Sequence, residues 1–255
     1  MKKIYVLNTY NNNNSDEGLY VVYHSIKNLG TIVNTASHIK NSIVIVAGIP
    51  HMYINRLSNK NINICYTTYE FFPLPKLWIQ CLNAYSTIIV PHSKIKELFE
   101  NSGVKRPIHI VQQGYPKRIP YLNMKDSNKF TVGFCGVPVK RKNLDLLIKA
   151  IETLKTTIPN IVLKVHISKY YREMTPYVFP SNCSFDVTYG YKTDDELSKW
   201  YSSLDAYIFP SSGEGWSFTP RESLSLSIPT IISDCLVHKD LEKYSKMIDL
   251  PVTQT

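Results

Sequence analysis

The stretch Ala206-Tyr-Ile-Phe-Pro-Ser-Ser-Gly-Glu-Gly-Trp-Ser-Phe-Thr-Pro-Arg-Glu222 predicts a strand, a tight loop and a helix in succession. Its first four residues are apolar and end at Pro210, and small polar residues follow from Ser211 to Gly213. Pro220 suits the first turn of a helix, where its missing N–H costs little. We therefore expect a strand-to-helix turn at the carboxyl end of a parallel strand.

Two glutamates, Glu214 and Glu222, flank this turn. The start of a helix presents free backbone N–H groups and a positive dipole end, which favour a phosphate or diphosphate. A carboxylate at either position can accept hydrogen bonds from sugar hydroxyls. The pair therefore predicts a site for a nucleotide sugar.

Short β-branched runs alternate with helical patterns along the first half of the chain. The buried strands that we expect there cover residues 4–7, 42–46, 62–65, 87–90 and 108–111. Helices are expected at 17–29, stopped by Gly30, and at 93–101. This alternation predicts a parallel sheet with helices on both faces.

The second half repeats the alternation after a polar stretch. Its expected strands are 130–135, 161–167, 184–189, 206–209 and 230–233, and its helices are 143–156 and 194–203. Thr193 and Glu196 are spaced as a capping box. We thus expect an α/β protein with domains at 1–116 and 130–255, joined by a linker at 117–129.

The bulk composition is that of a globular protein. The chain has 255 residues, 44% hydrophobic and 19% charged, and contains no run of about 18 apolar residues. Five cysteines without a close pair (65, 81, 135, 183 and 235) suggest neither disulfides nor a zinc site, so a cytoplasmic location is expected. The N-terminal apolar stretch is too brief for a signal peptide. The net charge of +9 favours anionic partners, among them nucleotide diphosphates, lipid headgroups and nucleic acid.

The segment from Glu214 to Glu222 resembles the signature of the retaining glycosyltransferases of family 4. These enzymes have the GT-B fold, in which two Rossmann-like domains face a cleft. The segments 133–145 and 189–211 also resemble the family, and 62–115 does so less closely. The resemblance implies transfer of a hexose from a nucleoside-diphosphate sugar to a glycan, lipid or other hydroxyl acceptor.

Roles for individual residues follow from the same resemblance. Glu214 is implied to act on the donor sugar as the catalytic residue, Glu222 to bind the ribose and Lys142 to bind the diphosphate. Backbone N–H groups around Gly215 to Thr219 would stabilise the leaving group without a metal or other cofactor, and the chain contains no Asp-x-Asp triplet. The full donor-binding set is Gly136, Arg141, Lys142, Gly215, Trp216, Ser217, Phe218, Thr219 and Glu222.

Three departures from the family pattern stand beside this resemblance. Val137 replaces an arginine after the glycine, with Arg141 as the candidate substitute, and Asn143 replaces a glycine. Only about twenty residues follow Ser233, where family members have a longer tail. The chain is therefore expected to be a compact enzyme with a short C-terminal tail, to depend on a partner subunit, or to bind without catalysis.

The first half offers weaker candidates. Gly18 and Glu70 are the residues that we assign to the acceptor side, and contact with a membrane surface is kept as an alternative. For His92, beside a helix start, structural hydrogen bonding is favoured over chemistry.

Functions of other classes fit some features of the sequence. A non-catalytic sugar-nucleotide or glycan-binding subunit fits Val137 and the short tail. A dinucleotide oxidoreductase needs a glycine fingerprint, which the loop after Leu7 lacks. Nucleic acid as the acceptor rests on charge alone and is disfavoured.

Overall fold

The computed structural model describes residues 2–9, 17–114, 121–167, 178–179 and 184–250. The chain divides into two compact units, Met1–Gly114 and Tyr115–Thr255, which are described separately below. No helix within the described ranges is both long and apolar enough to cross a membrane.

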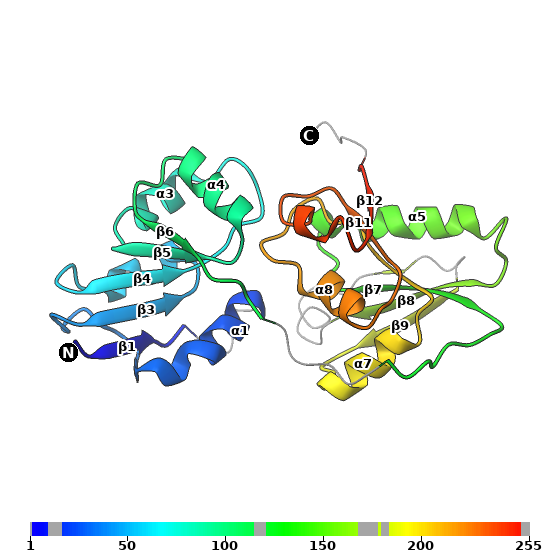
Figure 1. The fold of residues 1–255 in the computed structure, drawn as a ribbon, viewed down its shortest axis with the longest axis horizontal. Coiled ribbons are helices and arrows are strands. Elements are labelled where there is room, and N and C mark those ends of the chain that lie inside the picture. The colour runs from blue at the N-terminus through cyan, green and yellow to red at the C-terminus, as the bar shows by residue number, and fades with distance from the viewer. Residues whose placement is uncertain (1, 10–16, 115–120, 168–177, 180–183, 251–255) are drawn as a thin grey trace. The chain divides into compact units, whose positions relative to one another are not determined.

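The N-terminal unit is a six-stranded parallel sheet of order β2-β1-β3-β4-β5-β6 (Figure 1). Its strands are β1 Ile4–Leu7, β2 Thr31–Val33, β3 Ile43–Ala47, β4 Ile62–Tyr66, β5 Thr87–Val90 and β6 Ile108–Ile110. Its helices are α1 Glu17–Ile26, α2 Pro50–Tyr53, α3 Lys76–Leu82 and α4 Ser93–Asn101, with 3-10 turns at Lys27–Leu29 and Ile54–Arg56.

The spacing of apolar residues in α4 determines which face of the helix is buried. Ile95, Leu98 and Phe99 recur at the spacing of one helix face, and all three are buried. Burial of each such side chain contributes about 1.5–3 kcal/mol, which offsets the cost of ordering the helix. The side chain of His92 caps the helix by accepting a hydrogen bond from the Lys94 N–H at 3.0 Å. The structural role favoured for His92 is therefore confirmed.

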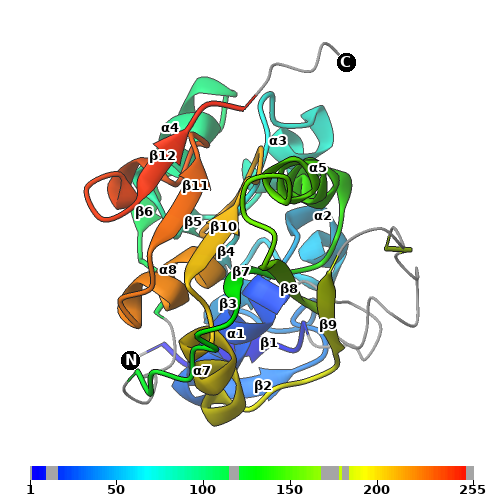
Figure 2. The ribbon, with the colours of Figure 1, turned by 90° about the vertical axis from the view of Figure 1, so that its right-hand side faces the viewer.

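The C-terminal unit is a second six-stranded parallel sheet, of order β12-β11-β10-β7-β8-β9 (Figure 2). Its strands are β7 Phe130–Cys135, β8 Ile161–Ile167, β9 Phe185–Tyr189, β10 Ala206–Phe209, β11 Thr230–Ser233 and β12 Lys246–Ile248. Its helices are α5 Leu144–Leu154, α7 Asp194–Ser202 and α8 Phe218–Ser225, with 3-10 turns at Lys140–Lys142 and Lys239–Leu241. The expected α/β fold with two parallel sheets is confirmed.

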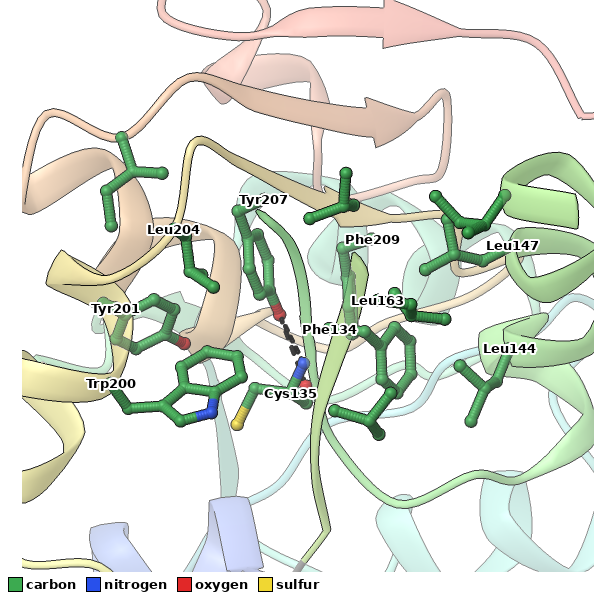
Figure 3. Packing of buried hydrophobic residues seen from close by; sticks show 14 of the residues in the cluster. Phe134, Cys135, Leu144, Leu147, Leu163, Trp200, Tyr201, Leu204, Tyr207 and Phe209 are labelled. Carbon is green, nitrogen blue, oxygen red and sulfur yellow. Dashed lines mark hydrogen bonds between the residues drawn. The ribbon is translucent and has the colours of Figure 1, made fainter. Parts of the chain in front are cut away.

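Aromatic side chains from β7 and β10 fill the core of this unit. Phe134 and Phe209 stack with ring centroids 5.8 Å apart, and Tyr207 stacks on Phe209 at 6.2 Å. The Tyr207 hydroxyl bonds to the backbone of Cys135 (Figure 3). Figure 3 also shows side chains of α7 at one end of this row of rings and of α5 at the other. Burial on this scale fixes the β7–β10 pairing on which the site described below depends.

Several boundaries differ from the sequence predictions. The helix expected at 17–29 leaves the α-helical conformation after Ile26 and continues as a 3-10 turn. Gly30 does end it, but in an extended conformation (φ −164°), and a Cβ there would lie 2.4 Å from the Ile4 carbonyl oxygen. The glycine is therefore required by close packing against β1 rather than by a left-handed cap. The capping box of Thr193 and Glu196 is confirmed at the start of α7.

The polar stretch predicted as the interdomain linker lies partly outside the described residues. Its described part, 121–129, is attached to the C-terminal unit: Met124 N–H donates to the Ser202 carbonyl at 3.1 Å, and Lys125 lies 3.4 Å from Asp205. These residues therefore belong structurally to that unit rather than to a separate linker.

Candidate functional site

The strand order of the C-terminal sheet places two loops at one point. From β7 the chain proceeds outward through β8 and β9, and then returns to the other side of β7 as β10, followed by β11 and β12. The order therefore reverses between β7 and β10, which pair in parallel. Ligands of open α/β sheets bind outside the carboxyl ends of the strands at such a reversal. The loops 136–143 and 210–217 follow these two strands and form the candidate site.

Glu214 lies between cationic and hydroxyl donors in this site. Its carboxylate accepts hydrogen bonds from Arg141 Nη1 at 2.5 Å and from Ser211 Oγ at 2.8 Å, and Lys142 Nζ lies at 3.9 Å. The residue is 7% exposed. Burial alone would raise the pKa of Glu214, but the charges of Lys142 and Arg141 and the hydrogen bonds outweigh it, so the pKa is lowered. Glu214 is thus an ionised carboxylate fixed in one orientation.

Further hydrogen bonds join the two loops. Arg141 Nη1 also donates to the Gly213 carbonyl at 2.7 Å. Asn143 Nδ2 donates to the Pro210 carbonyl at 2.8 Å and to Ser212 Oγ at 2.7 Å. Asn143 adopts a left-handed conformation (φ 51°), which asparagine tolerates better than most residues. Among residues with a Cβ, asparagine is therefore one of the best suited to this position.

Lys142 is held beside the end of β7. Its Nζ lies 5.1 Å from the centre of the Phe209 ring, and it is 15% exposed as a side chain. Gly136 has φ 154°, and a Cβ at that position would lie 3.1 Å from Lys142 Nζ. The glycine thus leaves room for the ammonium group. Gly136, Arg141 and Lys142 are brought together with Glu214, as the sequence predicted that the two segments would be.

The helix α8 begins directly after the second loop. In the described structure no side chain caps its first turn, and the residue before it, Ser217, has φ 63°. Gly215, Trp216 and Ser217 form the loop, and Phe218 and Thr219 are the first two residues of the helix. This is the strand-turn-helix arrangement predicted from the sequence. Backbone N–H groups of such a turn are suited to bind a phosphate.

Glu222 is the fifth residue of α8 and is 6% exposed. It accepts a hydrogen bond from the Tyr201 hydroxyl at 3.0 Å, which ties it to α7. Burial, and then the nearby Glu222 charge, raise the pKa of Tyr201, so its phenol remains a proton donor. Tyr201 was missed in the sequence because nothing local distinguishes it from an ordinary core tyrosine.

Two further residues behind the loop were also missed, His238 and Asp240. His238 is fully buried, and its Nε2 lies 2.7 Å from Ser217 Oγ. Asp240 accepts hydrogen bonds from Arg221, whose guanidinium carbon lies 3.9 Å from the centre of the Trp216 ring. Both lie beyond β11, and only their contacts with the motif reveal them.

The acceptor-side candidates lie in the N-terminal unit. Gly18 is the second residue of α1, and Glu70 is a half-buried residue in the loop that follows β4. Across the part of the chain that the structure describes, no three His, Cys, Asp or Glu side chains gather as a metal ion would require.

The sequence of the C-terminal unit is similar to glycosyltransferases. Residues 129–244 match the family model described as "Glycosyl transferases group 1". A curated relative, "Uncharacterized glycosyltransferase 335" of Sulfolobus islandicus rod-shaped virus 1, is 24% identical over 182 residues, which cover 65% of this chain and 53% of the relative. This chain therefore spans about half the length of that relative.

Solved structures share the fold. The chain is similar to Anabaena Alr3699/HepE, solved in complex with UDP-glucose (TM-score 0.69, 10% identity, 98% of this chain and 86% of that one). It is also similar to TarM, with a TM-score of 0.66 and 15% identity over 90% of this chain and 47% of that one. The pneumococcal O-GlcNAc transferase GtfA, solved with UDP and GlcNAc, is similar with a TM-score of 0.61 and 15% identity over 92% of this chain and 49% of that one. The two parallel sheets with flanking helices have the fold of these GT-B structures, and residues 129–244 are the part of the chain that is similar to the glycosyl transferase group 1 family.

Proposed function

We propose that the protein is a retaining glycosyltransferase of family 4 that moves a hexose from a nucleoside-diphosphate sugar to a hydroxyl acceptor. The observation that carries the proposal is the buried, ionised Glu214, set beside Lys142 at the strand-order reversal and just before α8. The bound UDP-glucose and UDP of the similar structures support a UDP-sugar as the donor class.

The leaving diphosphate is the group that most needs stabilisation. As the bond between the anomeric carbon and the phosphate oxygen breaks, negative charge grows on the diphosphate. Lys142 and the N–H groups of residues 215–219 would stabilise this charge without a metal ion. Loss of one such donor in other enzymes costs about 2.7–4 kcal/mol of transition-state stabilisation, so a small set of them suffices for a large rate effect.

The two glutamates would act on different parts of the donor. The ionised carboxylate of Glu214 can accept hydrogen bonds from hexose hydroxyls and stabilise positive charge on the sugar as the transition state forms. Glu222 would accept from the ribose hydroxyls, with its carboxylate oriented by Tyr201. The acceptor, a glycan, a lipid-linked sugar or another hydroxyl compound, would bind through the N-terminal unit, where Gly18 and Glu70 are the candidates.

A thermal-shift panel of nucleotide sugars tests the donor class, because a ligand that binds only the folded protein raises the melting temperature. We expect UDP-hexoses to raise it and the free hexoses not to. Donor turnover is then measured with Glu214→Gln and with Glu242→Gln, an exposed control in the same unit. Glu214→Gln should lower kcat by at least about 100-fold with little change in nucleotide affinity, in line with loss of one transition-state contact. Equal effects of both variants would contradict the proposed role of Glu214.

Binding without transfer is the second candidate function. Val137 stands where the family has an arginine, and the substitute Arg141 is bonded to Glu214 and to the Gly213 carbonyl. With Arg141 engaged in this way, fewer cationic groups are left to bind the leaving diphosphate. A nucleotide sugar that stabilises the protein but is neither hydrolysed nor transferred in the presence of a panel of acceptors would establish this function instead.

A further inference from the structure

The segment Cys235–Leu241, called the rear segment here, contacts the loop before α8 through a buried histidine. His238 lies on this segment and is fully buried. Its Nδ1 lies 2.8 Å from the Ser233 carbonyl oxygen, which can only accept, so Nδ1 carries the proton. Burial lowers the pKa of His238 and favours the neutral ring. Nε2 is therefore an acceptor, and the hydroxyl of Ser217 donates to it at 2.7 Å.

Ser217 needs such a partner because of its backbone. Its φ of 63° and ψ of 76° lie in the left-handed region, which costs a residue with a Cβ about 1–3 kcal/mol unless its surroundings impose it. Ser217 is 5% exposed and immediately precedes the first turn of α8. Its conformation thus decides where the N–H groups of residues 218 and 219 point.

A second contact from the rear segment reaches the neighbouring residue. Asp240 accepts from Arg221 Nη2 at 3.0 and 3.1 Å. Arg221 Nε in turn donates to the Trp216 carbonyl at 3.0 Å, and its guanidinium covers the Trp216 ring. Two consecutive residues of the loop, 216 and 217, are therefore held from the rear segment by independent hydrogen bonds.

We propose that His238 is a positioning residue of the donor site: its hydrogen bond holds Ser217 in the left-handed conformation that aims the first N–H groups of α8 at the diphosphate. The identity of the ligand rests on the proposed function. The local geometry does not, and it can be measured without any ligand.

A purely structural His238 would only fasten the rear segment to β11, and glycine at position 217 separates the two roles. Glycine adopts positive φ without the penalty of a Cβ, so Ser217→Gly should make the hydrogen bond dispensable for positioning. The Ser217→Gly substitution leaves the hydrogen bond between His238 and Ser233 unchanged. Ser217→Ala removes the same hydroxyl but keeps the Cβ, which makes it the matched control.

Amide exchange is the ligand-free readout. In His238→Asn the shorter amide can still donate to the Ser233 carbonyl, as Nδ1 does, but does not extend to Ser217. His238→Gln places its terminal amide where Nε2 stands. We expect His238→Asn and Ser217→Ala to speed exchange of the N–H groups of residues 215–219 at least tenfold, and His238→Gln to change it less than threefold. The double variant Ser217→Gly, His238→Asn should exchange like Ser217→Gly alone.

Affinity for UDP and for uridine is the functional readout. His238→Asn and Ser217→Ala should weaken UDP about tenfold and leave uridine within twofold, because the loss concerns the diphosphate. Ser217→Gly should weaken UDP binding less than Ser217→Ala does, and adding His238→Asn to Ser217→Gly should change the affinity less than threefold further. If His238→Asn costs the same UDP affinity whether residue 217 is serine or glycine, or if Ser217→Gly is no better than Ser217→Ala, His238 is structural and the inference is wrong. Failure of the unmodified protein to bind UDP would instead refute the proposed function, and the exchange comparison would still decide the inference.

Discussion

The ion pair between Arg141 and Glu214 permits a quantitative test of the site. The side chains of these residues are 22% and 9% exposed. Removing one partner of a buried pair costs about 3–5 kcal/mol when the remaining charge is left uncompensated. Here the Ser211 hydroxyl at 2.8 Å and Lys142 at 3.9 Å remain, and the guanidinium is partly in solvent. We therefore expect Arg141→Met to lower the free energy of unfolding by about 2 kcal/mol at pH 7.

The assay is urea-induced unfolding of a double-mutant cycle. Arg141→Met is compared in the unmodified protein and in Glu214→Gln, where the carboxylate that pairs with the arginine is absent. The two losses should differ by about 2 kcal/mol, which is the coupling energy of the pair. Lys140→Met, on the same 3-10 turn but exposed, should change the stability by less than about 0.5 kcal/mol. Equal losses in both backgrounds would refute this account of the site.

The pH dependence follows from the direction of the Glu214 pKa shift. The pKa is lower in the folded than in the unfolded state, so the stabilisation is complete above the unfolded value and disappears as the pH falls through the folded value. The difference between the unmodified protein and Arg141→Met should therefore shrink on acidification below about pH 4.3, the ordinary value for glutamate. A difference that stayed constant down to pH 2 would assign the loss to packing of the arginine stem instead.

Substitutions at three other positions test the geometry around the site. Asn143→Ala should lower the free energy of unfolding by about 1–3 kcal/mol, because it removes two hydrogen bonds at a left-handed position. Asn143→Gly should lower it less, since glycine adopts this conformation without strain. Calorimetry measures both losses, and a larger loss for glycine than for alanine would contradict this explanation. Gly136→Ala should weaken UDP binding by pressing on Lys142 while leaving uridine affinity unchanged, and an equal loss for both ligands would argue against it. Gly133→Ala should destabilise the C-terminal unit by about 1–3 kcal/mol, since its Cβ would lie 2.2 Å from Leu204; an unchanged melting temperature would show that Leu204 has room to move.

Apolar and β-branched runs predicted the strands well, and β1, β5 and β11 have the expected bounds of 4–7, 87–90 and 230–233. β7, β8 and β10 have the bounds expected from Phe130–Cys135, Ile161–Ile167 and Ala206–Phe209. Each is buried enough that its composition alone marks it. β2 and β12 were missed, because these three-residue edge strands contain no buried residue, whereas the equally short edge strand β6 has Ile108 buried and was predicted.

The secondary structure around the candidate site could be predicted from the sequence, but the contacts between its residues could not. The sequence could place Glu214 in a turn and Arg141 before a helix, but it gave no sign that the two side chains would form an ion pair. The ion pair joins residues 73 positions apart and depends on the β7–β10 pairing. His238 was invisible for a related reason, since only the left-handed backbone of Ser217 creates the need for it. Contacts and backbone angles of this kind follow from tertiary structure, not from local pattern.

The reversal of strand order between β7 and β10 also bears on how the chain folds. Their pairing brings Val132 to Ala206, whereas the other pairings of that sheet join residues much closer in the chain. Closing the longer loop costs roughly 1 kcal/mol more in chain entropy than closing one a third as long. We expect β7 and β10 to pair late in folding, after the three strands on each side of them have formed. The proposed nucleotide site would then form only in this last step. A newly made chain that stopped before it would expose the apolar edges of both halves to chaperones.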